Sequence, residues 1–268
     1  MKKVNLFLLV LVIFMASCGT TRTVPVTGRK QNLVVSDEQM LSLSTQQYNE
    51  YMKKAKKSTN TANTAMVQRV GKKLATAVET YLKHNGLANE LSGYKWEFNL
   101  VKDNSVNAFC MPGGKIVVYE GLLPVTKNET ALAIVLGHEI AHAVAKHSAE
   151  QLSKQYKQQV GMQIGSAVLS AAGMGADTSS LLEWATSKGL QLRNLKYSRD
   201  HENEADHMGL IFAAMAGYNP NEAVTFWQRM AAASGGSSSD FLSDHPSDAK
   251  RVENIKGWMP EALKYYKK

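Results

Sequence analysis

Cysteine, proline and long apolar runs are scarce in this sequence. It has two cysteines and six prolines in 268 residues, so a fold stapled by several disulfides is excluded. Its two longest apolar stretches, residues 6–15 and 161–176, are too short to span a bilayer stably, and polar residues interrupt the second. The remaining composition is that of an ordinary globular protein, and the length allows one large domain or two small ones.

A concentrated patch of positive charge is also lacking. The formal charge is +8, but the basic residues are spread along the chain. No aromatic-interleaved or known nucleic-acid motif accompanies them, so we expect solvated faces and no nucleic-acid partner. A mild attraction to anionic lipid headgroups stays open. The densest basic groups are Lys53–Lys57, Lys72 with Lys73, and Lys267 with Lys268.

A short apolar stretch near the first residue has the pattern of a secretion signal. Lys2 and Lys3 precede the apolar residues 6–15, and two small residues separate that stretch from Cys18. This order resembles a bacterial lipobox, so we expect residues 1–17 to be a lipoprotein signal peptide and Cys18 to be acylated after cleavage. The expected location is the periplasmic side of a bacterial cell envelope, lipid-anchored, at the outer membrane. The alternative is an ordinary secretory signal with a coincidental cysteine.

The segment after the predicted anchor is polar. Residues 18–32 contain the cysteine and then GTTRTVPVTGRKQN, whose proline and glycines predict a tether. With Cys18 acylated, Cys110 is the only thiol left, and no disulfide can form within the mature chain. The core must then stabilise the protein, and we assign residues 33–268 to a single domain.

Hydrophobic periodicity predicts helices followed by a small sheet. Ser36, with Gln39 three residues later, has the pattern of a capping box that opens the first helix. Apolar residues then recur at 3.6-residue spacing before the period changes to two. The expected elements are helices over 36–57 and 67–82 and strands over 94–100 and 115–119. An edge strand at this point in the chain can pair with an extended peptide.

The chain is organised around residues 128–147, NETALAIVLGHEIAHAVAKH. They contain no proline and one glycine, and their apolar runs predict a buried helix. His138 and His142 are four residues apart, hence on one face, so both imidazoles can reach one zinc ion. Glu139 would flank the metal rather than bind it, where a base that acts on water must stand. H-E-x-x-H therefore predicts a zinc site with an adjacent base.

The alternative for this stretch is a core helix whose two histidines bond to backbone or water. A glutamate midway along an apolar helix argues against it, because such a side chain is almost never fully buried without a partner. His147 lies about 140° round the helix from His142, so we expect it to point elsewhere.

A catalytic zinc takes three protein ligands and leaves one place for water, so the third ligand must come from another element. The best candidate is the segment 197–206, YSRDHENEAD, which opens a helical pattern that ends near Gly217. Glu202 and Asp206 share a face there, with Glu204 nearly opposite Glu202. Glu202 can ligate zinc while Asp206 accepts a hydrogen bond from the outer ring nitrogen of a ligating histidine. The alternative is a solvated acidic helix start.

Several other residues carry weaker expectations. Cys110 is expected to be a small half-buried strand residue, although an approach to the zinc stays open. His201 and His207 are expected to be bystanders, on solvent or at the rim of the cleft. Residues 161–176 form either a small-residue helix packed on the body or a mobile flap, and packing is the safer prediction.

Proline positions predict two late helices. Asn219-Pro220 and His245-Pro246 each open one, with a Gly-Ser loop over 235–239 between them. Arg251 lies one to two turns into the second of these helices. A histidine and an arginine at a cleft can stabilise negative charge on a tetrahedral oxygen. The alternative for His245 is a helix cap or a surface position.

Five stretches together resemble the metallopeptidase family of the CAAX prenyl proteases, the HtpX-type heat-shock proteases and the mitochondrial Oma-type proteases, specifically its periplasmic lipoprotein branch. They cover the chain from near the predicted mature start almost to its last residue. The stretches are PVTGRKQ (25–31), NAFCMPGG (107–114), HEIAH (138–142), SRDHENEAD (198–206) and HPSDAKR (245–251).

This resemblance implies an α+β, mainly helical, zincin-like domain of the gluzincin type, with a small antiparallel sheet ahead of the active-site helix. It implies one zinc ion per chain on His138, His142 and Glu202, with Glu139 as base. His245 and Arg251 would lie at the zinc cleft. In some relatives the histidine that matches His245 approaches the metal, which marks a resting, self-inhibited state.

The resemblance also implies that Asn107, with Ala108 and Phe109, binds the substrate backbone or the oxyanion. The chain departs from the family at Cys110, where a small apolar residue is more common, and it lacks the membrane-spanning helices of integral members.

The predicted activity is that of a membrane-anchored zinc endopeptidase. By resemblance, its substrates would be unfolded or misassembled envelope proteins, cleaved in quality control. Two alternatives stay open: a chaperone-like zinc lipoprotein that binds clients and seldom cuts, and a structural zinc site with four closed protein ligands. The oligomeric state is not predicted.

Overall fold

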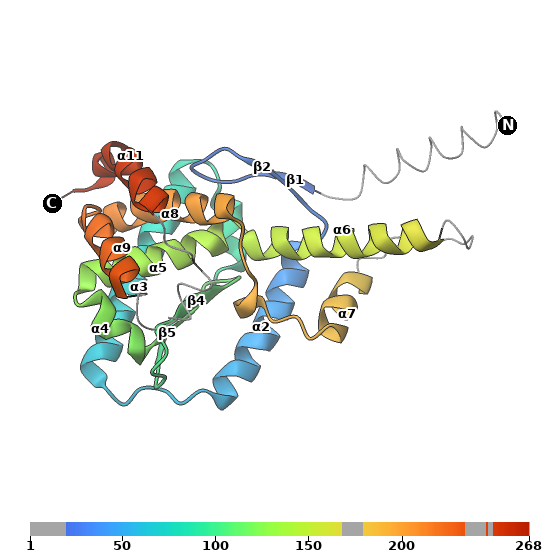
Figure 1. The fold of residues 1–268 in the computed structure, drawn as a ribbon, viewed down its shortest axis with the longest axis horizontal. Coiled ribbons are helices and arrows are strands. Elements are labelled where there is room, and N and C mark those ends of the chain that lie inside the picture. Colours follow the sequence, from blue (N-terminus) through green and yellow to red (C-terminus); the bar gives the residue numbers. More distant parts are fainter. Residues whose placement is uncertain (1–19, 168–178, 234–244, 246–248, 268) are drawn as a thin grey trace.

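The structure is a computed structural model that describes residues 20–167, 179–233, 245 and 249–267 (Figure 1). It is mainly helical with two small sheets, which confirms the predicted α+β class. The helices and strands are β1 (Thr20–Thr23), β2 (Lys30–Leu33), α2 (Asp37–Lys54), α3 (Thr61–His84), β3 (Glu97–Val101), β4 (Ala108–Met111), β5 (Lys115–Tyr119), α4 (Leu123–Thr126), α5 (Glu129–Val144), α6 (His147–Ala167), α7 (Ser179–Ser187), α8 (Arg199–Met215), α9 (Glu222–Ala233) and α11 (Ala249–Tyr265).

The helix starts follow the capping residues of the sequence. The predicted capping box of α2 is confirmed, because the Gln39 amide donates to Ser36 Oγ while the Ser36 amide donates to Gln39 Oε1. At the start of α5, Asn128 Oδ1 accepts a hydrogen bond from the Ala131 amide at 2.7 Å. Both caps satisfy amides that the first turn of a helix leaves without partners.

The three-stranded sheet has the order β3-β5-β4. β4 pairs antiparallel with β5, but β3 pairs parallel with β5, so the prediction of an antiparallel sheet holds for only one of its two ladders. The reason is that β4, although it lies between the other two strands in sequence, takes an outer place in the sheet. β4 is therefore an edge strand, and it packs beside α5 (Figure 1).

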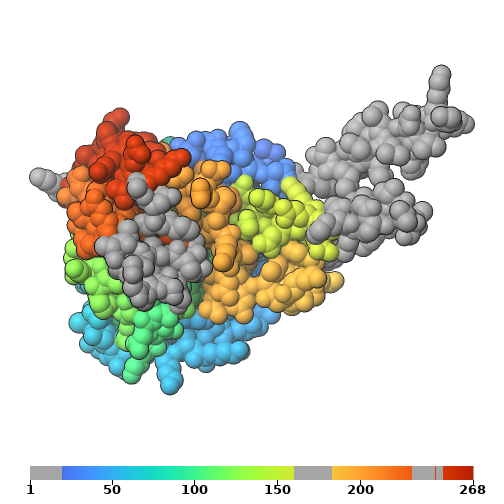
Figure 2. Space-filling view, viewed as in Figure 1, coloured from blue at the N-terminus to red at the C-terminus, as the bar shows by residue number. Residues whose placement is uncertain are grey.

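The N-terminal segment corrects the prediction of a tether. β1 and β2 form an antiparallel hairpin over residues 20–33, and Val24 in its connection is buried at 1% exposure. Arg29 pairs with Glu150 of α6 and Glu204 of α8, each at 2.7 Å. The hairpin lies against α6 and α8 at the surface (Figure 2). A polar composition concealed this packing, because the contacts are made to residues more than a hundred positions away.

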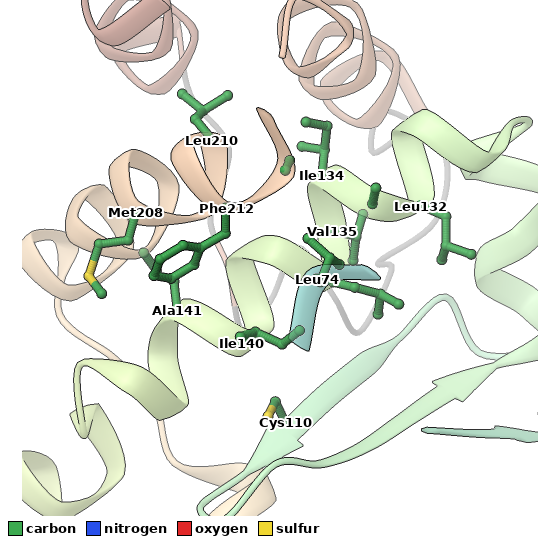
Figure 3. Close-up of a cluster of buried hydrophobic side chains, with 14 of the residues drawn as sticks. Leu74, Cys110, Leu132, Ile134, Val135, Ile140, Ala141, Met208, Leu210 and Phe212 are labelled. Atoms are coloured by element: carbon green, nitrogen blue, oxygen red, sulfur yellow. The ribbon is translucent and has the colours of Figure 1, made fainter. Parts of the chain in front are cut away.

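α5 and α8 pack against each other at the centre of the domain, and apolar side chains from both enter the main core (Figure 3). Their backbones approach closely where Gly137 meets Gly209. A Cβ atom added to Gly137 would lie 2.8 Å from the Gly209 carbonyl oxygen, and one added to Gly209 would lie 2.7 Å from the His138 amide nitrogen. Two glycines thus allow a helix spacing that a side chain at either position would prevent.

The helix predicted over 128–147 is interrupted before its end. α5 ends at Val144, Lys146 has a left-handed backbone with φ of 55°, and α6 begins at His147. Lys146 Nζ lies 2.9 Å from an Asp37 oxygen and 2.6 Å from a Glu90 oxygen. These ion pairs help to hold a conformation that is unusual for a residue with a side chain.

Several predictions fall wholly or partly on residues outside the described ranges. The signal peptide over 1–17, lipidation of Cys18 and the loop over 235–239 lie there and stay predictions. Residues 161–167 belong to α6, whereas the rest of the expected small-residue segment lies outside. The helix expected from His245-Pro246 is described from Ala249, where α11 begins. Among the described residues, no helix combines the length and apolar character needed to cross a membrane.

Candidate metal site

Four buried side chains converge between α5, α8 and the segment before α11. His138, His142, Glu202 and His245 each offer one ligand atom, and these atoms lie within 4.8 Å of one another. The two α5 histidines place their Nε2 atoms 3.0 Å apart. Glu202 Oε2 is 3.3 Å from His138 Nε2, and Glu202 Oε1 is 3.4 Å from His142 Nε2. The two separations to Glu202 match those expected around a tetrahedral zinc, ~3.3–3.6 Å between ligand atoms, and the distance between the two Nε2 atoms is shorter.

Two helices carry three of these donors. On α5 the histidines are one turn apart, so both face α8. On α8, Ser198 caps the first turn by accepting a hydrogen bond from the His201 amide, and Glu202 follows at its start. The contact between Gly137 and Gly209 brings the two helices close enough for Glu202 to reach both imidazoles.

His138 is held from outside by Asp206. Its Nδ1 atom donates a hydrogen bond to Asp206 Oδ1 at 2.9 Å, so its Nε2 lone pair faces the convergence point. Arg251 donates to both Asp206 oxygens, at 2.7 and 2.8 Å, and its guanidinium lies 3.3 Å from the ring centroid of Trp227. The structure therefore brings Asp206 and Arg251 to the site, with Trp227 as a support that sequence reasoning missed.

His142 is held by a different set of residues, and the predicted direction of His147 is wrong. His147 does not point elsewhere: its Nδ1 atom lies 2.9 Å from His142 Nδ1, and its Nε2 atom lies 2.9 Å from Glu204 Oε2. Arg29 donates two hydrogen bonds to Glu204, at 2.7 and 2.9 Å. The helical-wheel argument failed because the left-handed Lys146 separates the two histidines into different helices. Thr27 of the hairpin also donates a hydrogen bond to Glu204.

Aromatic and histidine rings close the outer side of the site. Tyr197 stacks on His142, with ring centroids 4.2 Å apart and planes 23° apart, and its hydroxyl is 2.8 Å from Ser148 Oγ. His201 stacks on His147 and lies 3.3 Å from a Glu150 oxygen. It is 7% exposed, so the expectation of a solvent or rim position is wrong.

Glu139 sits beside the four donors and is poorly paired. It is buried, and among the described residues its Oε1 atom receives no hydrogen bond. His245 Nε2 lies 3.5 Å from this oxygen. Burial raises the pKa of the Glu139 carboxyl above its ordinary value, against the attraction of His245 and His138. An unsatisfied carboxylate oxygen beside converging donors is a site for a proton.

His245 lies between the third ligand candidate and the base candidate. Its Nδ1 atom is 3.0 Å from Glu202 Oε2 and 3.2 Å from His138 Nε2. Arg251 Nη1 donates to the His245 carbonyl at 3.2 Å, which fixes the backbone there. With His245 as a fourth ligand, a tetrahedral shell would have no place left for water.

Burial lowers the pKa of both α5 histidines, whereas the neighbouring carboxylates raise it. Burial lowers the pKa of His138, but hydrogen bonds to Asp206 and Glu202 outweigh it and raise the pKa to about 9. Burial lowers the pKa of His142 well below its ordinary value. Burial also disfavours ionised Glu202, but the three surrounding histidines lower its pKa overall.

The edge strand β4 runs beside α5 with its residues alternating between two cores. Ala108 and Cys110 enter the main core under α5. Phe109 enters a second apolar cluster, which also contains Tyr119 and Leu152. The Phe109 ring packs edge-on against Tyr51 at 5.3 Å, so a substrate contact there would be made by main chain. Asn107 Oδ1 accepts a hydrogen bond from the Ala108 amide at 2.7 Å. These three substrate-binding roles stay predictions.

Cys110 is more buried than expected, at 8% exposure. Its thiol lies 3.6 Å from the Met111 carbonyl oxygen. Burial raises the pKa of the thiol well above its ordinary value, and nearby Glu139 raises it further. Among the described residues Cys110 is not one of the grouped metal donors, so its packing role fits best.

The donor set fits a zinc ion. Imidazole nitrogens and a carboxylate oxygen are ordinary zinc ligands, and the outer nitrogen of each α5 histidine already has a partner. That arrangement turns the Nε2 lone pairs of His138 and His142 toward Glu202. A cation between these atoms would be attracted by the Glu202 carboxylate and by both imidazole lone pairs, so the site is complementary to a positive ion.

Comparisons with known proteins agree with this geometry. The family model described as "Peptidase family M48" matches residues 61–259. The mitochondrial metalloendopeptidase OMA1 of Schizosaccharomyces pombe is 36% identical over 187 residues, 69% of this chain and 53% of that relative. The mitochondrial metalloendopeptidase OMA1 of Homo sapiens is 31% identical over 245 residues, 90% of this chain and 46% of that relative.

A bacterial metalloprotease is also similar. LoiP of Escherichia coli (strain K12) is 29% identical over 177 residues, which cover 65% of this chain and 67% of that relative. The chain spans about half the length of the yeast and human relatives that it matches.

Proposed function

The chain belongs to peptidase family M48, and on that premise we propose that it is a zinc-dependent endopeptidase. The observation that carries the proposal is the pairing of two features. Four donors converge, and the buried Glu139 carboxylate beside them has an oxygen without a hydrogen bond among the described residues. A pure packing site has no use for a buried carboxylate oxygen that receives no hydrogen bond, because burying it in this way costs stability.

His138, His142 and Glu202 would hold the zinc ion. When bound, the ion would polarise a scissile carbonyl and make a water molecule more acidic. Asp206 keeps His138 in the tautomer whose Nε2 lone pair faces the site. Burial of all three side chains excludes bulk water from their inner faces.

Glu139 would act as the general base. Its Oε1 atom accepts a proton from the attacking water, and the raised pKa of the carboxyl lets it hold that proton. It then gives the proton to the leaving amine as the peptide bond breaks. The His245 ring, 3.5 Å from this oxygen, would donate a hydrogen bond to a tetrahedral oxyanion, and Arg251 behind it would add positive charge.

An extended peptide is the substrate form that we propose for the edge of β4. Ala108–Met111 pair with β5 on one side only. These residues are buried and β4 contacts the turn Leu192–Asn194, so β-strand addition would require this edge to be uncovered first. Asn107, at the start of this strand, would contact the substrate backbone. Such recognition reads main chain rather than side chains, which suits unfolded proteins.

The proposed setting is the periplasmic side of a bacterial envelope, with the protein anchored through Cys18 at the outer membrane and acting on unfolded or misassembled envelope proteins. The residue pattern before Cys18 supports it. Cys18→Ser should abolish acylation, measured by mass spectrometry of the mature protein, and release it from membranes. If the mature wild-type protein lacks the added mass of acyl chains, residues 1–17 would be an ordinary secretory signal.

Substitution Glu139→Gln tests the activity. We expect zinc content and thermal stability to persist while cleavage of unfolded casein falls by about 10²- to 10⁴-fold, the usual contribution of a general base. Glu253→Gln, on the exposed side of α11, is the matched control and should change neither. If Glu139→Gln cleaved casein as fast as the wild type, Glu139 would not be the general base.

The same assay separates the other candidate functions. A wild type that holds unfolded clients and one zinc ion but cuts nothing under any unfolding condition would be a chaperone-like binder. Cobalt substitution tests the structural alternative, because a shell closed by His138, His142, Glu202 and His245 should give a spectrum unaffected by small anions.

A further inference from the structure

A chain of buried polar contacts runs from His142 to the N-terminal hairpin. The contacts are His142 Nδ1 to His147 Nδ1 at 2.9 Å, His147 Nε2 to Glu204 Oε2 at 2.9 Å, and Glu204 to Arg29 at 2.7 Å. The four residues come from α5, α6, α8 and the β1–β2 connection. Because His147 is fully buried, its ring nitrogens depend on these partners rather than on water.

The direction of each hydrogen bond follows from the chemistry of the last acceptor. An ionised carboxylate can only accept, so His147 Nε2 carries the proton that it donates to Glu204. A neutral His147 then has its lone pair on Nδ1, which must accept a proton from His142 Nδ1. His142 is thereby fixed as the Nδ1–H tautomer, and its Nε2 lone pair faces His138 and Glu202.

We propose that His147, backed by Glu204 and Arg29, is a positioning residue that selects the metal-binding tautomer of His142. The inference rests on the proposed metal site and deepens it. It assigns to His142 an outer partner that is a neutral ring, whereas the outer partner of His138 is a carboxylate.

A partner of this kind meets a specific need at His142. The stacked Tyr197 ring fixes the plane of the imidazole but cannot distinguish its two nitrogens, because stacking is insensitive to which one carries the proton. A hydrogen-bond acceptor at Nδ1 favours the Nδ1–H form, whereas the Glu202 oxygen 3.4 Å from Nε2 favours the Nε2–H form. His147 supplies the acceptor at Nδ1, and Lys146 in its left-handed conformation turns the chain so that the His147 ring faces back toward α5.

The hairpin completes this chain of contacts. Arg29 donates to both Glu204 and Glu150, so its guanidinium offsets part of the negative charge of the carboxylate that accepts from His147. Arg29 thereby connects residues near the start of the chain to the selection of a metal ligand.

A pair of isosteric substitutions tests the role of His147. His147→Asn keeps an acceptor oxygen near the position of Nδ1, whereas His147→Leu has the same size without one. We expect zinc affinity to fall by about 10- to 100-fold in His147→Leu and by clearly less in His147→Asn. Zinc dissociation constants are measured by competition with a chelator, on purified protein that starts at residue 19.

Stability gives the readout that separates positioning from packing. A buried asparagine is less well accommodated than a leucine, so His147→Asn should melt at or below the temperature of His147→Leu in metal-free protein. The two variants would then rank in opposite orders for stability and for zinc affinity. Equal zinc affinities, or affinities that follow the melting temperatures, would overturn the proposal.

A second measurement reads the tautomer itself. Long-range nitrogen–proton NMR spectra of the metal-free protein should show His142 protonated at Nδ1 in the wild type and shifted toward the Nε2–H form in His147→Leu. Glu204→Gln keeps the shape of the acceptor and serves if His147→Leu does not fold. A wild-type His142 protonated at Nε2 would contradict the proposed direction of the relay.

Matched controls separate this inference from the proposed function. His207 on α8 also pairs with a glutamate, Glu261, at 2.7 Å, but away from the metal site. His207→Leu should leave zinc affinity unchanged. If the wild type itself binds no zinc, the proposed function fails. If it binds zinc and cuts unfolded protein while His147→Leu keeps full zinc affinity, only the positioning role fails.

Discussion

His138 and His142 lie one turn apart on the same helix, yet the protein holds them in opposite ways. The outer nitrogen of His138 faces a carboxylate, Asp206, which is itself clamped by Arg251. The outer nitrogen of His142 faces the neutral ring of His147. The pKa of His138 is raised to about 9 by Asp206 and Glu202, in spite of burial, whereas burial lowers that of His142. The pKa of a histidine ligand is therefore not set by its position on the helix. It depends on the residue that contacts the outer ring nitrogen.

Asp206 and Arg251, which hold His138, form a carboxylate arm, and His147, Glu204 and Arg29, which hold His142, form a histidine arm. The two arms have different effects on their ligands. The carboxylate arm increases the basicity of His138 and so strengthens its bond to a cation, at the cost of binding a proton when no cation is present. The histidine arm brings no carboxylate to His142, so it does not offset the lowering of the His142 pKa by burial, and it fixes the tautomer. Substitutions in the carboxylate arm should therefore have the larger effects.

The largest effect is expected from Asp206→Asn, which removes the charge of the carboxylate arm. Arg251 and His138 would lose their buried anionic partner, and breaking a buried pair in this way costs about 3–5 kcal/mol. Zinc affinity should fall by about 100-fold. Denaturant unfolding and chelator competition measure the two quantities, and Asp200→Asn on the exposed first turn of α8 is the control. Unfolding at wild-type denaturant concentration would show that Arg251 and His138 do not depend on this charge.

An intermediate effect is expected from Gly209→Ala, which acts on both arms at once. The new Cβ atom would lie 2.7 Å from the His138 amide nitrogen, so α8 must move away and carry its ligands with it. Overpacking of this kind costs about 1–3 kcal/mol, and zinc affinity should fall as well. Gly257→Ala on α11 is the matched control, because no atom lies within 4 Å of its added Cβ. It should be neutral or slightly stabilising, and equal losses in both variants would exclude helix spacing as the cause.

The smallest effect is expected from Arg29→Gln, at the far end of the histidine arm. Burial raises the pKa of Glu150 and of Glu204, but hydrogen bonds, which include those from Arg29, outweigh it and lower both to about 2. Lowered carboxyl pKa values stabilise the fold above the unfolded value near 4.5 and lose that effect as the pH falls toward 2. The variant should be about 1 kcal/mol less stable at pH 7.

Denaturant unfolding at several pH values checks this sign. The stability difference between wild type and Arg29→Gln should be full above pH ~5 and should shrink as both carboxylates protonate. Arg69→Gln removes the exposed pair with Glu129 and is the control, with a smaller difference expected. A difference that stays constant down to pH 3 would mean that the guanidinium contributes packing rather than charge.

The sequence predicted those parts of the site that lie within single helices. His138, His142 and Glu139 occupy one turn of α5, and Glu202 and Asp206 occupy one turn of α8, so helical spacing alone relates each set. Each of the two sets contributes side chains to the convergence that the structure describes. His245 came from family resemblance, because no local spacing connects it to either helix.

Prediction failed where one residue changes the direction of the chain or where partners are far apart in sequence. His147 was assigned the wrong direction because no pattern reveals that Lys146 adopts a left-handed conformation. Arg29 lies in a polar segment whose partners are known only after folding. The parallel pairing of β3 with β5 was missed because sequence order does not fix which strand takes the outer place. Glu204, in the acidic stretch already selected, was the one available signal for the second arm.

The contact between Gly137 and Gly209 affects how an ion would enter the site. Because main chain touches main chain there, no rotamer change can widen or narrow the gap between α5 and α8. The ligands on α5 and α8 are thus carried by two helices whose spacing is set as the domain folds. The conformational entropy of bringing these ligands together is lost at that stage. Capture of the ion would then be governed chiefly by how readily it sheds its own hydration water, with little rearrangement of the polypeptide.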